Sequence, residues 1–275
     1  MNNKVLFLRK ETVIIMTTPL EEAHQIIDAL FDELGTGGLT PGPGEFVDGQ
    51  AAIVEMIEKD WPSWREVEWP GFYMKHKALD LCKQKYPAVF QEFKPTPKLR
   101  LLKGKYIWDV RFAATATTDL DEKPKNIILS DTKIQENLLD EYTGFGLILV
   151  DAIASLDLDG EFIKWLTKEK GGKSLYDKKR IADTRPPRMR KTGFMIKRVF
   201  ASYFPKELFL EGINEGWLRN DFQRTMRQQD ASSRNTKYLL YFEKIPDDCK
   251  LFVRNFNFDR DDFEYFHNNP DIGSF

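Results

Sequence analysis

Two stretches decide the fold of this chain: Lys105-Tyr106-Ile107-Trp108-Asp109-Val110-Arg111-Phe112 and Asn126-Ile127-Ile128-Leu129-Ser130-Asp131-Thr132-Lys133-Ile134. Both have the β-branched and aromatic content of strands, and Asp119-Leu120-Asp121-Glu122-Lys123-Pro124 between them is turn-forming. We therefore predict a β-hairpin with its turn near Leu120. A third apolar stretch, Leu147 to Ala154, is either a strand or a buried helix.

The N-terminal part of the chain has a helical pattern. Thr18-Pro19-Leu20-Glu21 is typical of a helix start, with Thr as N-cap, Pro in the first turn and Glu in a capping box. Further helices are expected over about 51–60 and 72–86. The stiff segment 93–97, Phe-Lys-Pro-Thr-Pro, follows them as a connector.

The later part of the chain alternates strand and helix patterns. A helix is expected at about 216–229, and strands at 238–242 and 251–253. We predict an α/β (α+β) fold in which a mainly helical N-terminal region, residues 1–95, packs on a mixed central β-sheet in residues 96–275. The two ranges can also form one continuous domain.

Composition excludes several classes of protein. With 41% hydrophobic and 13% aromatic residues, the 275-residue chain is too apolar to be disordered. Its two cysteines, Cys82 and Cys249, are far apart, which excludes a disulfide framework or a cysteine-based zinc site. No apolar run reaches the ~18 residues of a membrane span, and the N-terminus has no signal-peptide pattern. The expected location is cytoplasmic.

The predicted hairpin would bring charged side chains together. With the turn near Leu120, Asp109 lies opposite Asp131, and Lys133 projects from the same face as Asp131. Two facing carboxylates repel each other, and a bound Mg²⁺ would offset this repulsion. A nearby lysine could orient or help deprotonate an attacking water. The pattern predicts a metal-dependent hydrolytic site.

This arrangement resembles the PD-(D/E)xK nuclease superfamily, which includes most type II restriction endonucleases. The match is Trp108-Asp109, a gap of 21 residues, and an apolar strand that ends in Asp131-Thr132-Lys133. It covers about 30 of the 275 residues, and Trp108 stands in place of the Pro. The resemblance implies that Asp109 and Asp131 bind Mg²⁺ and that Lys133 serves the nucleophilic water.

Alternatives remain at this site. A helical glutamate (Glu55, Glu66 or Glu68) could join it, and Asp151 could replace Asp131 as the second metal-binding acid. In the alternative without a metal site, Asp131 and Lys133 form an exposed ion pair, while Asp109 pairs with Arg111.

Charge is distributed unevenly along the chain. The net charge is −2, yet residues 164–198 contain 13 Lys and Arg against 3 Asp and Glu. Such asymmetry indicates a surface for a polyanion. The expected DNA-binding residues are Lys178, Lys179, Arg180, Arg185, Arg188, Arg190, Lys191, Lys197 and Arg198.

Together these patterns favour a Mg²⁺-dependent endonuclease acting on double-stranded DNA, of the type II restriction class. Double-strand cleavage with one site per chain favours a homodimer. The alternative is a non-catalytic nucleic-acid-binding or phage/host interaction protein, in which the acidic residues are only surface charge.

Overall fold

The structure, a computed structural model, describes residues 17–32, 46–97, 99–115, 124–185, 189–223 and 235–256. A mixed sheet with the strand order β1-β7-β6-β4-β3-β2 forms its centre, and β10 also pairs with β7. β4 and β6 are parallel, whereas the other neighbouring pairs in this sheet are antiparallel. The strands of this sheet are β1 (Phe46–Asp48), β2 (Gln91–Thr96), β3 (Leu99–Lys103), β4 (Ile107–Thr115), β6 (Gly144–Leu156), β7 (Lys191–Pro205) and β10 (Lys250–Asn255).

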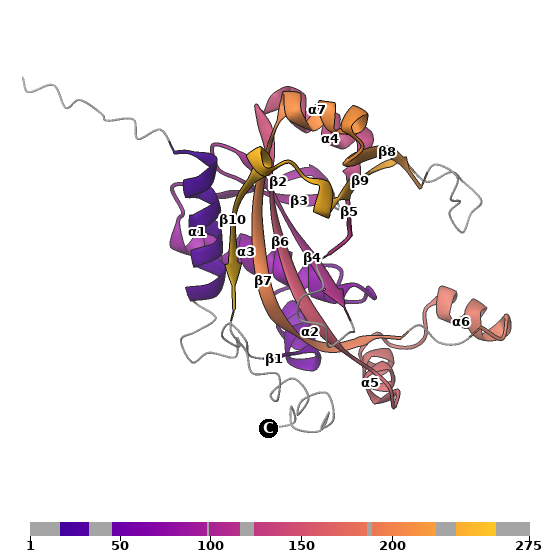
Figure 1. The fold of residues 1–275 in the computed structure, drawn as a ribbon. Helices are drawn as coiled ribbons and strands as arrows, with labels where there is room; N and C mark the ends of the chain where they lie inside the picture. The colour runs from indigo at the N-terminus through magenta and orange to yellow at the C-terminus, as the bar shows by residue number, and fades with distance from the viewer. Residues whose placement is uncertain are drawn as a thin grey trace, which may run out of the picture.

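Three helices, α1 (Pro19–Asp32), α2 (Gly49–Glu58) and α3 (Trp69–Lys85), cover one face of this sheet (Figure 1). Their buried side chains pack with Trp108 and Val110 of β4 in a single core. Because successive strand residues point to opposite faces, Asp109 and Arg111 lie on the other face, together with Ile107. The predicted N-terminal helical region therefore shares its core with the sheet.

The other face packs against a second, smaller sheet. Its order is β5-β9-β8, and Ile107 packs in the core that these strands share with two helices. The elements of this layer are β5 (Asn126–Asp131), α4 (Thr132–Glu141), α7 (Lys206–Glu215), β8 (Leu218–Phe222) and β9 (Lys237–Tyr241), followed by short 3₁₀ turns at Phe242–Lys244 and Asp247–Cys249.

An arm projects from the body of the molecule. It joins β6 to β7 and contains α5 (Glu161–Glu169) and α6 (Leu175–Ala182), which lie away from the two sheets in Figure 1. Ser174 caps α6, because its hydroxyl oxygen accepts a hydrogen bond from the backbone N–H of Asp177 at 3.1 Å. Most of the basic segment seen in the sequence lies in this arm.

Several local predictions are confirmed. The backbone N–H of Glu21 donates to Thr18 Oγ1 at 3.2 Å, and the N–H of Thr18 donates to Glu21 Oε2 at 2.7 Å, so the capping box starts α1. Leu147 to Ala154, for which either a strand or a buried helix was expected, lies within strand β6.

Among the helices of the described ranges, none has the length and apolar character of a membrane span.

Other local predictions are wrong. β5 ends at Asp131, and Thr132 and Lys133 begin α4, so the second predicted strand is too long. The expected helix at 216–229 begins as strand β8, and residues 224–229 lie outside the described ranges. The expected connector at 93–97 is mostly strand β2, which pairs with β3.

Candidate functional site

The predicted hairpin does not form. β4 pairs in parallel with β6, where Asp109 lies opposite Leu147. β5 belongs to the other sheet, where Asp131 lies opposite Lys237 of β9. A strand pattern predicts that each segment is extended but not which neighbour it pairs with, and this is where the prediction failed. The two aspartates are therefore not facing residues of one strand pair.

Asp131 and Lys133 have a local role at the start of α4. Asp131 is the N-cap residue of this helix, and its Oδ2 accepts a hydrogen bond from Asn235 Nδ2 at 3.0 Å. Lys133 is exposed on the first turn of the same helix. The structure thus separates them from Asp109 by placing them in a different layer.

Asp109 is fully buried and paired with two cations. Lys75 Nζ lies 2.5 Å from its Oδ1, and Arg111 Nε lies 2.6 Å from its Oδ2. The pairing of Asp109 with Arg111 confirms this part of the alternative without a metal site. Lys75 was not expected from the sequence, because it comes from α3 and no short-range spacing connects it to β4.

Burial and neighbouring charges shift the pKa values of Asp109 and Lys75. Burial alone would raise the pKa of Asp109, but Arg111 and Lys75 outweigh it and hold this pKa below its ordinary value. Burial lowers the pKa of Lys75, and the nearby Arg111 lowers it further against the attraction of Asp109. Lys75 and Arg111, both partly buried, thus pair with a single carboxylate, so this cluster has a net positive charge.

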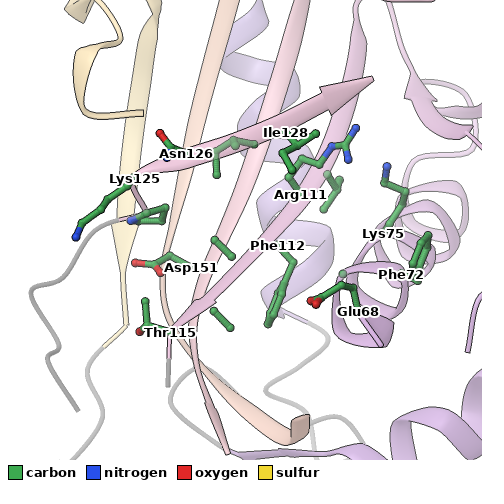
Figure 2. Close-up of a pocket in the computed structure, with 16 residues that line it drawn as sticks. Glu68, Phe72, Lys75, Arg111, Phe112, Thr115, Lys125, Asn126, Ile128 and Asp151 are labelled. Atoms are coloured by element: carbon green, nitrogen blue, oxygen red, sulfur yellow. The ribbon is translucent and has the colours of Figure 1, made fainter. Parts of the chain in front are cut away.

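A pocket of about 510 Å³ opens beside this cluster. α3 and the residue before it contribute Lys75, Phe72 and Glu68, and Figure 2 shows them on one side, with Thr115 and Asp151 on the other. β4 forms the wall between these sides, and residues 124–128 at the start of β5 complete the lining. β3 pairs with β4 only at Ile107 and Trp108 in the described register. The later part of this edge of β4 is therefore left to α3 and the pocket.

Asp151 is a buried aspartate in the lining of this pocket. Lys197 Nζ and Arg198 Nε lie 3.5 and 2.8 Å from its Oδ2. Its Oδ1 is buried and has no hydrogen-bond partner among the described residues. Burial raises the pKa of Asp151 above its ordinary value, even though Lys197 and Arg198 act against this. Asp151 therefore keeps one buried acceptor atom unsatisfied next to the pocket.

Asp151 and Asp109 are too far apart to hold one metal ion together. Asp151 lies opposite Ala113 on the parallel neighbour, four residues beyond Asp109. At ~3.3 Å per residue this offset is roughly 13 Å along the strands. Two carboxylates that share a Mg²⁺ through ~2.0–2.1 Å bonds must be much closer.

Two cations occupy the surroundings of Asp109 where a Mg²⁺ ion was expected. The described residues contain no group of three or more His, Cys, Asp or Glu side chains that could hold a metal ion. Asp109, the expected first ligand, is fully buried with a cation at each oxygen. A divalent cation there would be repelled by Lys75 and Arg111.

Of the candidate glutamates, only Glu68 lines the pocket, and its Oε2 pairs with Lys191 Nζ at 2.5 Å. Glu55 instead accepts hydrogen bonds from Lys77 and Tyr73 between α2 and α3. Glu66 is exposed before α3. A metal-binding role for Glu55 has no support in this arrangement.

The charged residues that line the pocket within the described ranges carry a small excess of positive charge. They are three cations, Lys75, Arg111 and Lys125, and two carboxylates, Glu68 and Asp151. An anion bound here would offset this imbalance.

The basic segment divides into two groups. Lys178, Lys179 and Arg185 are exposed on the arm, and Arg180 is half-buried there. Arg190 and Lys197, two of the expected DNA-binding residues, are buried. Lys191 and Arg198 are half-buried and pair with Glu68 and Asp151, and Arg188 lies outside the described residues.

Comparison with known proteins gave no match, whether with protein-family models, curated proteins or solved structures.

Proposed function

We propose that this protein binds nucleic acid and that the pocket beside β4 holds a backbone phosphate between Lys75 and Arg111. The observation that carries the proposal is that two cations beside the pocket, Lys75 and Arg111, share one carboxylate. Both side chains border the pocket and compete for the single carboxylate of Asp109. A phosphate oxygen would take the remaining donors of the ammonium and guanidinium groups.

The exposed lysines of the arm support the same function. Lys178 and Lys179 stand on α6, which is connected to the pocket region through β6 and β7. A long polyanion can contact both places, whereas a small anion can occupy only one. We therefore favour duplex DNA over a free phosphate compound.

Salt dependence of DNA binding tests the proposal. Affinity for a short labelled duplex is measured over a NaCl series for the wild type, Lys75→Gln and Arg111→Gln. Each lost phosphate contact should reduce the log–log slope by about 0.9. The control is Lys206→Gln at the start of α7, where an exposed lysine pairs with Asp140. Unchanged slopes in folded Lys75→Gln and Arg111→Gln would overturn the proposed phosphate position.

A second candidate function is cleavage of the bound DNA by a restriction-endonuclease-like fold. It is supported by Asp109-Val110-Arg111, which puts a carboxylate and a guanidinium on one face of a central strand beside the pocket. In this interpretation Arg111 takes the position of the lysine in the Asp-x-Lys pattern. A homodimer would supply the second site for double-strand cleavage.

Incubation with supercoiled plasmid and Mg²⁺, against an EDTA control, separates the two candidates. Nicked or linear product that forms only with Mg²⁺ would support cleavage. If the protein binds DNA but the plasmid stays intact both with Mg²⁺ and with EDTA, only the binding function would be supported.

A further inference from the structure

The arm contains a cavity of its own. It has a volume of about 460 Å³ and lies between α5 and α6. Ile163 and Thr167 line it from α5, and Ile181 lines it from α6. This volume is within the range of roughly 300–1,000 Å³ that is typical of small-molecule sites. The cavity is therefore large enough for more than a bare phosphate ion.

Cations surround this cavity. Its charged lining residues within the described ranges are Lys164, Lys173, Arg180, Arg185 and Arg190, together with one carboxylate, Asp177. Asp177 already accepts a hydrogen bond from the Ser174 hydroxyl at 2.6 Å, and its Oδ2 lies 3.9 Å from Arg190. Glu161 and Asp183 pair with Lys164 and Arg185 and reduce the charge excess without removing it.

Arg190 is a buried cation in the lining of this cavity. Only 2% of its surface is exposed, although it lies at the base of a projecting arm. Its position in the lining gives the cavity a cationic floor, while Ile163 and Ile181 provide apolar walls.

We propose that this cavity binds a nucleotide, with its phosphate at the arginines and its base against the apolar walls. Guanidinium groups fork onto phosphate oxygens and also stack on planar rings. A purely apolar ligand would bury cations without compensation, and a simple inorganic anion would leave the apolar part empty. The choice of a nucleotide rests on the proposed nucleic-acid binding, and the cavity is a second site apart from the β4 pocket.

The nucleotide can come from two sources: a free mononucleotide, or one unit that leaves the stack of a bound strand. Calorimetry with a 5′-mononucleotide, its nucleoside, inorganic phosphate and a single-stranded oligonucleotide distinguishes them. We expect the mononucleotide or the oligonucleotide to bind, and the nucleoside and phosphate to bind at least about tenfold more weakly because each lacks one part of the ligand.

Two variants test the location. Thr167→Trp fills the cavity, and the pair Arg180→Gln and Arg185→Gln removes two cations from its rim. Each of these two variants should reduce the affinity for the nucleotide or oligonucleotide by about tenfold or more. Lys168→Gln, an exposed lysine of α5 outside the lining, is the matched control and should change nothing. Circular dichroism and the unfolding midpoint check that each variant is folded.

The outcomes are decisive for this site. Loss of mononucleotide binding in Thr167→Trp supports a free nucleotide, and loss only with the oligonucleotide supports an unstacked unit. Unchanged binding of both in Thr167→Trp, or phosphate binding as strong as nucleotide binding, would overturn the proposal. Since Lys75→Gln and Arg111→Gln leave the arm intact, failure of the β4 phosphate site would be seen separately.

Discussion

Lys75 and Asp109 are separated by 34 residues, yet the Nζ of Lys75 lies 2.5 Å from the Oδ1 of Asp109. The contact links α3 to β4 along the part of the strand that borders the pocket. Arg111 occupies the other oxygen of the same carboxylate. The ion pair between Lys75 and Asp109 thus has two consequences. It joins the helical layer to the sheet, and it makes Lys75 and Arg111 share a single carboxylate at the edge of the pocket.

Removal of Asp109 should destabilise the protein strongly. In Asp109→Ala, Lys75 and Arg111 lose their buried partner, and breaking such a pair typically costs ~3–5 kcal/mol. Urea unfolding measures the change. As control, Asp183→Ala removes an exposed partner of Arg185 on the arm and should leave the unfolding midpoint unchanged. A small effect of Asp109→Ala would show that the two cations find other partners or solvent easily.

Stability should fall in acid partly through Asp109. Its pKa in the folded protein is lower than the unfolded value of ~3.9, so the unfolded chain takes up the proton first as the pH decreases. The stabilising contribution is therefore complete above that value and is lost as the pH falls through the lower folded pKa. The unfolding free energy of Asp109→Asn should consequently depend less steeply on pH below about 4.

Asp151 provides a control of opposite sign. Its folded pKa is raised, so the folded protein binds the proton more readily than the unfolded chain. Lowering the pH through this raised pKa toward ~3.9 should therefore increase stability at this position. The unfolding free energy of the wild type should therefore rise relative to that of Asp151→Asn as the pH is lowered in this range. If Asp151→Asn and Asp109→Asn changed the pH dependence of the unfolding free energy in the same way, the opposite pKa shifts of the two aspartates would be contradicted.

The pair Asp131 and Lys133 should be dispensable for DNA binding. Both lie at the start of α4 and outside the pocket lining, so Asp131→Ala and Lys133→Ala should keep the wild-type affinity. Filter binding or fluorescence anisotropy measures this. If plasmid cleavage occurs and either substitution abolishes it, the chemistry would belong to the β5–α4 junction, and the β4 assignment would be wrong.

Exposed lysines of α6 should add to DNA binding without setting the position of the phosphate at β4. Changing Lys178 and Lys179 together to Gln should reduce the salt slope by up to about 1.8, which corresponds to two contacts with duplex phosphates. The distant Lys206→Gln again serves as a reference. A slope equal to that of the wild type would show that the arm does not contact the backbone.

Local sequence patterns predicted individual elements well where short-range forces decide. The capping box at Thr18 and Glu21 is one example, since its four groups lie within one turn. Strand character at Trp108 and Ile127 was also visible, because apolar and β-branched residues favour extended backbone. The end of β5 was missed, since Asp131 both closes a strand and begins a helix, and these two roles have similar sequence patterns.

The site itself shows where sequence reasoning reached its limit. Asp109 was correctly singled out as a charged residue in an apolar strand, and Asp151 was named as a rival. Their cationic partners from other elements, Lys75 on α3 and Lys197 on β7, have no local signal that connects them to these acids. A shared carboxylate and a pocket arise only when the layers pack together.

The sequence by itself determined an α/β protein with a helical start, a strand at β4, and a basic segment that follows the apolar stretch of β6. These properties follow from hydrophobic pattern, capping and charge over short distances. Only the tertiary structure decided that β4 pairs with β6 and that β5 joins another sheet. Strand pairing depends on which buried faces can pack together across the whole chain, and this is the reason that Asp109 meets Lys75 rather than Asp131.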